Sequence, residues 1–126
     1  MTGERILVVE DNPLNLKLVR DVLDAAGYDV VSATSGEEGL RVAAERTPDL
    51  VLMDLQLPGI DGTETLHRLR RDGMAPDVPV VAVTAFAMAE DHARAERAGF
   101  DAYVEKPISV RSLVHQVRQL LDGRVS

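Results

Sequence analysis

The chain of 126 residues is long enough for one domain with a single core and short for two. Hydrophobic residues make up 45% and charged residues 28% of it, and no apolar run approaches the roughly 20 residues that span a bilayer. The net charge of -7 and the two Phe and two Tyr argue against a nucleic-acid partner, and the absence of cysteine excludes disulfides and cysteine-ligated zinc.

The N-terminal segment does not have the pattern of a signal peptide. Its short apolar run, residues 6–9, is followed directly by an acid and not by a small-residue cleavage site. The lack of cysteine fits a reducing compartment. We therefore expect one domain over residues 1–126, a cytoplasmic location and no membrane partner.

The first part of the chain alternates apolar runs with a stretch of helical periodicity. Residues 5–10 and 29–34 are short Val-rich runs that predict strands. Between them, residues 13–27 carry apolar side chains at the helical period, with Asn12 as a start signal and Gly27 as a stop.

The middle of the chain repeats this order. Residues 35–45 predict a second helix, which opens with a Ser and a Glu at capping-box spacing. Residues 49–54 are an apolar run without polar alternation, typical of a strand covered on both faces. Asp61 and Glu64 have the spacing that starts a third helix, and residues 78–84 predict the fourth strand.

The last elements complete the pattern. A fourth helix over residues 87–99, a fifth strand over residues 101–106 and a helix from Ser109 to Leu121 follow, and Phe86 is expected in the core. Strands that alternate with helices predict an α/β fold, a doubly wound parallel sheet with helices on both faces.

Polar side chains stand where four of these predicted strands end. The first strand ends at Glu10 and Asp11, the third at Asp54, the fourth at Thr84 and the fifth at Lys106. The carboxyl ends of parallel strands share one edge of a sheet, where ligands bind near the switch in strand order. The sequence therefore predicts that these side chains converge.

A cation is one explanation for the three carboxylates. Glu10 and Asp11 alone leave open that they are helix caps or solvated loop residues. Together with Asp54 they favour a hard divalent cation, because oxygen ligands suit it and it offsets their mutual repulsion. We expect Mg²⁺, with Mn²⁺ or Ca²⁺ as possible substitutes.

Four segments resemble one protein family. They are VVEDN (8–12), LMDLQLPGIDG (52–62), VAVTAFA (81–87) and YVEKPIS (103–109). Together they resemble the receiver domains of two-component response regulators, in particular single-domain receivers of the DivK type and receivers attached to hybrid histidine kinases. The resemblance implies a five-stranded, flavodoxin-like (βα)5 receiver fold with strand order 2-1-3-4-5.

The resemblance also implies site roles. Asp54 matches the phosphoacceptor, and Lys106 the lysine that contacts the phosphoryl oxygens. Asp11 matches a direct Mg²⁺ ligand, Glu10 one that acts largely through water, and Gln56 the position whose backbone carbonyl coordinates the metal.

Two further positions match the switch of the family. Thr84 matches the hydroxyl that is recruited by the phosphoryl group, and Tyr103 the aromatic ring that then rotates. The Lys106–Pro107 bond matches a cis peptide, an isomer that a sequence cannot show. The implied partners are a sensor histidine kinase or histidine phosphotransfer protein, and a downstream protein on the face of the fourth helix, fifth strand and fifth helix.

The residues argue against two kinds of enzyme. A phosphatase of the haloacid dehalogenase kind needs a second Asp two residues after the nucleophile, where this chain has Gln56. A dinucleotide enzyme needs a glycine-rich turn after the first strand, and EDNPLN contains none. We thus expect no enzyme, but a phosphoacceptor that assists its own phosphorylation and dephosphorylation.

Two alternatives stay open. The chain could be a phosphorylation-independent binding module on the same fold, or a receiver excised from a hybrid histidine kinase. The Met1 start favours a natural single-domain protein. His67, His92 and His115 fall on predicted helices among charged neighbours, and we expect all three to be solvated surface residues.

Overall fold

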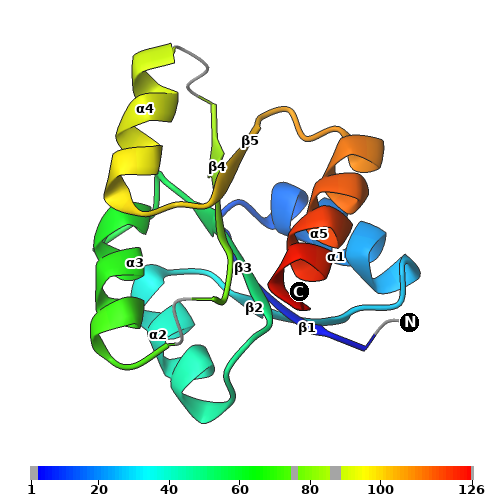
Figure 1. Cartoon of the computed structure of the whole chain (residues 1–126), viewed down its shortest axis with the longest axis horizontal. Coiled ribbons are helices and arrows are strands. Elements are labelled where there is room, and N and C mark those ends of the chain that lie inside the picture. The colour runs from blue at the N-terminus through cyan, green and yellow to red at the C-terminus, as the bar shows by residue number, and fades with distance from the viewer. Residues whose placement is uncertain (1–2, 75–76, 86–88, 126) are drawn as a thin grey trace.

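The computed structural model of the chain describes residues 3–74, 77–85 and 89–125, so Phe86 and the expected start of the fourth helix at residue 87 lie outside the described residues. Five parallel strands form one sheet: β1 (Arg5–Val9), β2 (Asp29–Ala33), β3 (Leu50–Asp54), β4 (Val80–Thr84) and β5 (Ala102–Glu105). Their order is β2-β1-β3-β4-β5, which confirms the predicted doubly wound fold (Figure 1).

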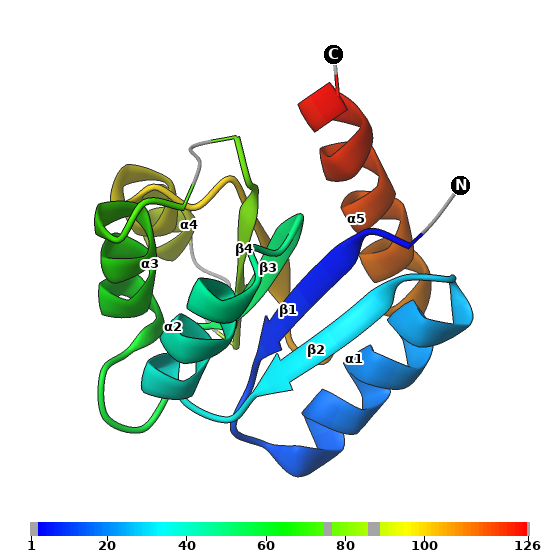
Figure 2. The ribbon, with the colours of Figure 1, turned by 90° about the horizontal axis from the view of Figure 1, so that it is seen from below.

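Five helices cover the two faces of the sheet. They are α1 (Pro13–Ala25), α2 (Gly36–Glu45), α3 (Gly62–Arg71), α4 (Ala89–Ala98) and α5 (Val110–Val125). Helices α1 and α5 lie on one face, and α2, α3 and α4 lie on the other (Figure 2).

Several element boundaries differ from the sequence prediction by one or two residues, and the end of α5 differs by four. Strand β4 begins at Val80 and not at residue 78, because Pro79 has no N–H to contribute to a strand ladder. Helix α5 continues to Val125, beyond the expected end at Leu121. The residues after Leu121 contain no proline, and the single Gly123 does not stop the helix.

The sheet is buried on both faces, as its apolar strands predicted. Along β1, Ile6 and Val8 pack into the core under α1 and α5, whereas Leu7 and Val9 pack into the core under α2, α3 and α4. This alternation is the two-residue period of a strand. The central strands β3 and β4 are thus buried along their whole length, and the loops that follow them reach solvent.

Side-chain caps fix where the helices begin. The Asn12 Oδ1 atom accepts hydrogen bonds from the N–H groups of Leu14 and Asn15, at 3.0 and 3.1 Å. The Asp61 Oδ1 atom accepts from the Glu64 N–H at 2.9 Å. Such caps satisfy the free N–H groups of a first helical turn, so they define the loops that carry the candidate site.

Among the described residues, none of the helices combines the length and apolar character that a membrane crossing requires.

Candidate functional site

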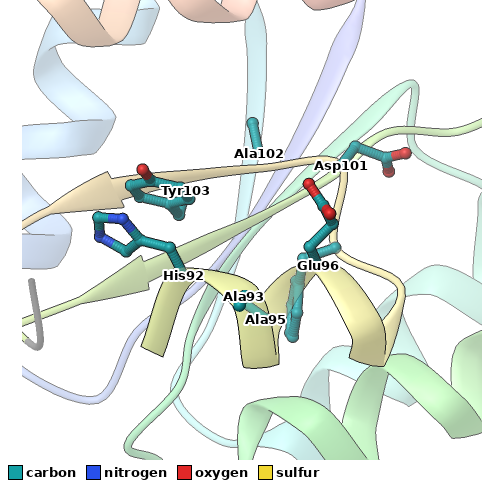
Figure 3. Close-up of a pocket in the computed structure, with 8 residues that line it drawn as sticks. His92, Ala93, Ala95, Glu96, Asp101, Ala102 and Tyr103 are labelled. Atoms are coloured by element: carbon teal, nitrogen blue, oxygen red, sulfur yellow. The ribbon is translucent and has the colours of Figure 1, made fainter. Parts of the chain in front are cut away.

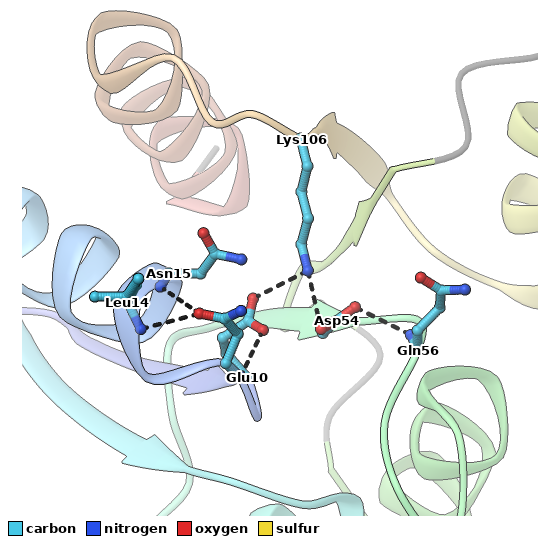
Figure 4. Close-up of polar contacts among 7 residues, drawn as sticks. Glu10, Leu14, Asn15, Asp54, Gln56 and Lys106 are labelled. Carbon is cyan, nitrogen blue, oxygen red and sulfur yellow. Dashed lines mark hydrogen bonds and ion pairs between the residues drawn. The ribbon is translucent and has the colours of Figure 1, made fainter.

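The predicted convergence of polar groups is present at the carboxyl edge of the sheet (Figure 4). Asp54 and Thr84 are the last residues of β3 and β4, and Glu10 and Lys106 directly follow β1 and β5. Glu10, Asp54 and Thr84 are buried, whereas the neighbouring Asp11 is exposed. The site is therefore a recess with one carboxylate at its rim.

Lys106 joins the two buried acids. Its Nζ atom lies 3.1 Å from Asp54 Oδ2 and 3.5 Å from Glu10 Oε1. Burial alone would lower the pKa of Lys106, but the hydrogen bond and charge of Asp54, together with those of Glu10, outweigh burial and raise it above 10.5. Lys106 is therefore a fixed positive charge that points at Asp54.

Ionisation of Glu10 is disfavoured in this group of side chains. Its burial, followed by the hydrogen bond and the negative charge of Asp54, raises the pKa of Glu10 from 4.5 to about 7. The Asn12 N–H, 3.1 Å from Glu10 Oε2, and the charge of Lys106 act in the opposite direction and are too weak to cancel the rise. Lys106 alone thus leaves the acidic recess short of positive charge.

The donor set fits a hard divalent cation. Glu10, Asp11 and Asp54 each offer a carboxylate oxygen, and these oxygens all lie within 4.8 Å of one another. A cation at this position would supply the positive charge that the raised pKa of Glu10 shows to be lacking. Oxygen-only donors suit Mg²⁺, and the exposed Asp11 leaves room for water ligands.

Gln56 contacts Asp54 through its backbone. The Gln56 N–H donates to Asp54 Oδ1 at 3.0 Å, while the side chain is exposed (Figure 4). This bond fixes one carboxylate oxygen of Asp54 and leaves Oδ2 toward Lys106. That the Gln56 carbonyl binds a metal stays a prediction.

Gly62 packs directly against the backbone of Asp54, a contact that the sequence did not lead us to predict. A Cβ atom at Gly62 would lie 2.5 Å from the Asp54 carbonyl oxygen and 2.9 Å from the Leu55 Cα atom. Only glycine therefore lets α3 begin directly against the end of β3. The signal in the sequence was a glycine next to the cap residue Asp61.

Thr84 and Tyr103 lie on neighbouring strands but face different hollows. Thr84 lines a pocket of about 280 Å³ together with Asp91, Arg94 and Ala95 of α4. Tyr103 lines a second pocket of about 310 Å³, on which Ala95 also borders (Figure 3). Helix α4 thus borders both hollows through Ala95.

The position of His92 differs from the prediction that all three histidines are solvated surface residues. His67 and His115 are exposed, as expected, but the side chain of His92 is only 21% exposed and its ring stacks on Tyr103. His92 stands three residues before Ala95, the buried residue of α4, and this helical spacing was the signal that it faces the protein. The Lys106–Pro107 peptide bond, whose isomer the sequence left open, is cis.

The chain matches known proteins over nearly its whole length. The family model described as response regulator receiver domain matches residues 6–118. The polar-differentiation response regulator DivK of Brucella ovis is 45% identical over 116 residues, which are 92% of this chain and 94% of that protein.

Solved structures agree in fold. A putative response regulator from Chloroflexus aurantiacus is 32% identical, with a TM-score of 0.90 over 95% of this chain and 98% of that one. The receiver domain of a sensor histidine kinase from Pseudomonas aeruginosa, solved with a magnesium ion coordinated in its active site cleft, is also 32% identical, with a TM-score of 0.87 over 95% of this chain and 98% of that one. The acidic recess, its lysine and these matches together place the chain in the response regulator receiver domain family.

Proposed function

We propose that the protein is a phosphorylation-controlled signalling receiver. Asp54 accepts a phosphoryl group from a histidine kinase or a histidine phosphotransfer protein, in a reaction that depends on Mg²⁺. The signal then passes to a partner by protein–protein contact. The observation that carries this proposal is the contact of Lys106 with Asp54, which is itself one of three clustered carboxylates.

The geometry suits phosphoryl transfer. Asp54 supplies the carboxylate nucleophile, and the bond from the donor to phosphorus breaks as the Asp54 oxygen forms its bond. Lys106 is placed to offset charge on the phosphoryl oxygens, because its Nζ atom already lies 3.1 Å from Asp54 Oδ2. The Gln56 N–H holds the other carboxylate oxygen and so orients the nucleophile.

Glu10, Asp11 and Asp54 are the residues that would hold the metal, with the Gln56 carbonyl as a further proposed ligand. When bound, a divalent cation would neutralise charge on the phosphoryl oxygens. The buried Glu10 supports this assignment, because its carboxylate is costly to ionise without additional positive charge.

Output is proposed to pass through Thr84 and α4. A phosphoryl group on Asp54 adds roughly -1.5 to -2 charge and strong acceptor oxygens, which the Thr84 hydroxyl can reach by moving inward with its loop. Helix α4, which borders the pocket beside Thr84, has Ala95 as its one buried residue. Because α4 buries so little apolar surface, we infer that it can shift at low cost.

Partners are proposed to dock on the face formed by α4, β5 and α5. Exposed side chains on this face are Glu90, Arg94, Arg97, Arg111 and His115, next to the half-buried Tyr103. Phosphorylation would shift a pre-existing equilibrium of this surface and would not create a new fold. No turnover of an external phosphoester is part of the proposal.

The test is labelling by a small phosphodonor. The wild type is incubated with acetyl phosphate with and without Mg²⁺, and the phosphorylated residue is located by mass spectrometry. We expect acid-labile phosphate on Asp54, formed only with Mg²⁺, and none on Asp54→Asn, which keeps nearly the same shape. Phosphate on another residue would mean that Asp54 is not the acceptor. No labelling with this donor or with purified histidine kinases would favour the phosphorylation-independent binding module.

A further inference from the structure

The ring of Tyr103 stacks on a histidine of helix α4. The rings of His92, on α4, and Tyr103, on β5, are stacked, with centroids 3.6 Å apart and planes inclined by 25°. Figure 3 shows the two rings facing each other at one end of the pocket between α4 and β5. The tyrosine whose rotation the family resemblance implies thus has a specific contact in the protein without phosphate.

One carboxylate lies close to the ring of His92. The Nε2 atom is buried, has no hydrogen-bond partner among the described residues and lies 3.4 Å from Glu105 Oε1, on β5. Glu96 and Asp101 also border this pocket, but the Asp101 carboxylate is already paired with Arg70 and accepts from the Val80 N–H, so Glu105 is the acid that faces His92. Protonation would therefore give His92 an ion pair with Glu105.

Protonation would also strengthen the ring contact. A cation over the face of an aromatic ring is attracted by its negative quadrupole. The neutral imidazole keeps the stacking contact but has neither this attraction nor the ion pair with Glu105. Both differences make the contact between His92 and Tyr103 stronger when His92 is charged.

The backbone beneath the ring is fixed from the other side. Gln116 of α5 donates from Nε2 to the Tyr103 carbonyl oxygen at 3.4 Å, and Val104 next to it is buried in the core. Any response of Tyr103 to phosphorylation is therefore a movement of its ring, and that movement must break or reshape the stack with His92.

We propose that His92 is a positioning residue for Tyr103. Its imidazole holds the tyrosine ring against α4 in the unphosphorylated protein, and the protonated ring, paired with Glu105, holds it more tightly. This inference rests on the proposed switch function and adds a regulator to it. Because coupling between two equilibria is reciprocal, protonation of His92 opposes the phosphorylated conformation, and phosphorylation in turn favours the neutral ring.

The experiment follows Tyr103 directly. The chain has two tyrosines, so protein made with 3-fluorotyrosine gives two ¹⁹F signals, one for Tyr103 and one for the buried Tyr28 on the opposite face of the sheet as an internal reference. Spectra are recorded between about pH 5.5 and 8, the range in which histidine changes charge. They are repeated with Mg²⁺ and beryllofluoride, which imitates the phosphoryl group on Asp54.

Three variants isolate the contribution of His92. His92→Phe keeps a ring for stacking and removes the proton, Glu105→Gln removes the charge opposite Nε2, and His115→Phe is the matched control on an exposed histidine of α5. An unchanged Tyr28 signal shows that each variant is folded. Glu10 also titrates in this range, but it does so equally in all of these variants.

We expect the chemical shift of Tyr103 to change with pH in the wild type and in His115→Phe. The change should be smaller in Glu105→Gln and absent in His92→Phe. Lowering the pH should weaken beryllofluoride binding roughly fivefold more in the wild type than in His92→Phe. A Tyr103 titration that persists in His92→Phe, or that vanishes in His115→Phe, would overturn the proposal. A Tyr103 signal that titrates through His92 but ignores beryllofluoride would instead refute the proposed switch.

Discussion

Lys106 and Asp54 are 52 residues apart in the chain, and the Lys106 Nζ atom lies 3.1 Å from Asp54 Oδ2. Their contact depends on the sheet order, which places β3 and β5 on either side of β4. The lysine keeps its charge because the carboxylates of Asp54 and Glu10 more than offset the effect of burial on its pKa.

Replacing Lys106 with Ala should slow phosphorylation of Asp54. The variant loses the positive charge that faces the phosphoryl oxygens, a loss that typically lowers rates by about 100-fold or more. The rate of labelling by acetyl phosphate at saturating Mg²⁺ measures this. Lys17→Ala, which removes an exposed lysine paired with Asp21, is the control and should label at the wild-type rate.

Replacing Asp11 with Ala should weaken Mg²⁺ binding and stop labelling. Asp11 is the exposed member of the carboxylate cluster, so its removal takes away a ligand without opening a cavity. Without metal the variant should melt slightly above the wild type, because one repelling charge is gone. Titration calorimetry with Mg²⁺ and thermal melts check both effects, with the exposed Asp24→Ala as the control. An unchanged Mg²⁺ affinity in Asp11→Ala would contradict the metal assignment.

The stability of the metal-free protein should fall as the pH rises from about 4.5 to about 7. The pKa of Glu10 is about 7 in the folded protein and 4.5 ordinarily, so the folded state binds this proton more tightly than the unfolded chain. This contribution is fully present below pH 4.5 and is lost as Glu10 ionises, by an amount on the order of 3 kcal/mol.

Urea unfolding across this pH range measures the effect. Glu10→Gln, which cannot ionise, should flatten the slope in the metal-free protein. Mg²⁺ should stabilise the wild type more at pH 8 than at pH 5.5, since the ionised site binds it better. A wild-type slope equal to that of Glu10→Gln would show that Glu10 is not the titrating group.

Replacing Gly62 with Ala should destabilise the protein and slow phosphorylation together. The added Cβ would lie 2.5 Å from the Asp54 carbonyl oxygen, so α3 or the end of β3 must move. We expect a loss of about 2 kcal/mol in the free energy of unfolding. Gly123→Ala in α5, where a Cβ meets no atom within 4 Å, is the matched control and should stabilise the helix by up to about 1 kcal/mol.

Replacing Thr84 with Val should separate phosphorylation from its output. The variant keeps the shape of a buried side chain but loses the hydroxyl, so Asp54 should still be labelled while Tyr103 no longer responds to beryllofluoride. The NMR signals of Tyr103 and of α4 report this. Thr63→Val, on the same pocket but on α3, should leave the Tyr103 response intact. A full Tyr103 response in Thr84→Val would remove the hydroxyl from the proposed route.

The sequence by itself determined the fold and the composition of the site. Uninterrupted apolar runs such as residues 49–54, each followed by a helical pattern, allow little except a parallel sheet covered on both faces. The caps at Asn12 and Asp61 were readable because they act within a few residues. The gathering of Glu10, Asp54 and Lys106 followed from the rule that parallel strands end at one edge.

Only the tertiary structure decided the contacts between elements. The stack of His92 on Tyr103, the approach of Gly62 to Asp54 and the cis bond before Pro107 depend on how α4, α3 and β5 are oriented in space. A period of 3.6 residues shows that one side of α4 faces the protein, but not which side chain of β5 it meets. The raised pKa of Glu10 is likewise a property of burial and of Asp54, 44 residues further along the chain, and no local pattern could supply it.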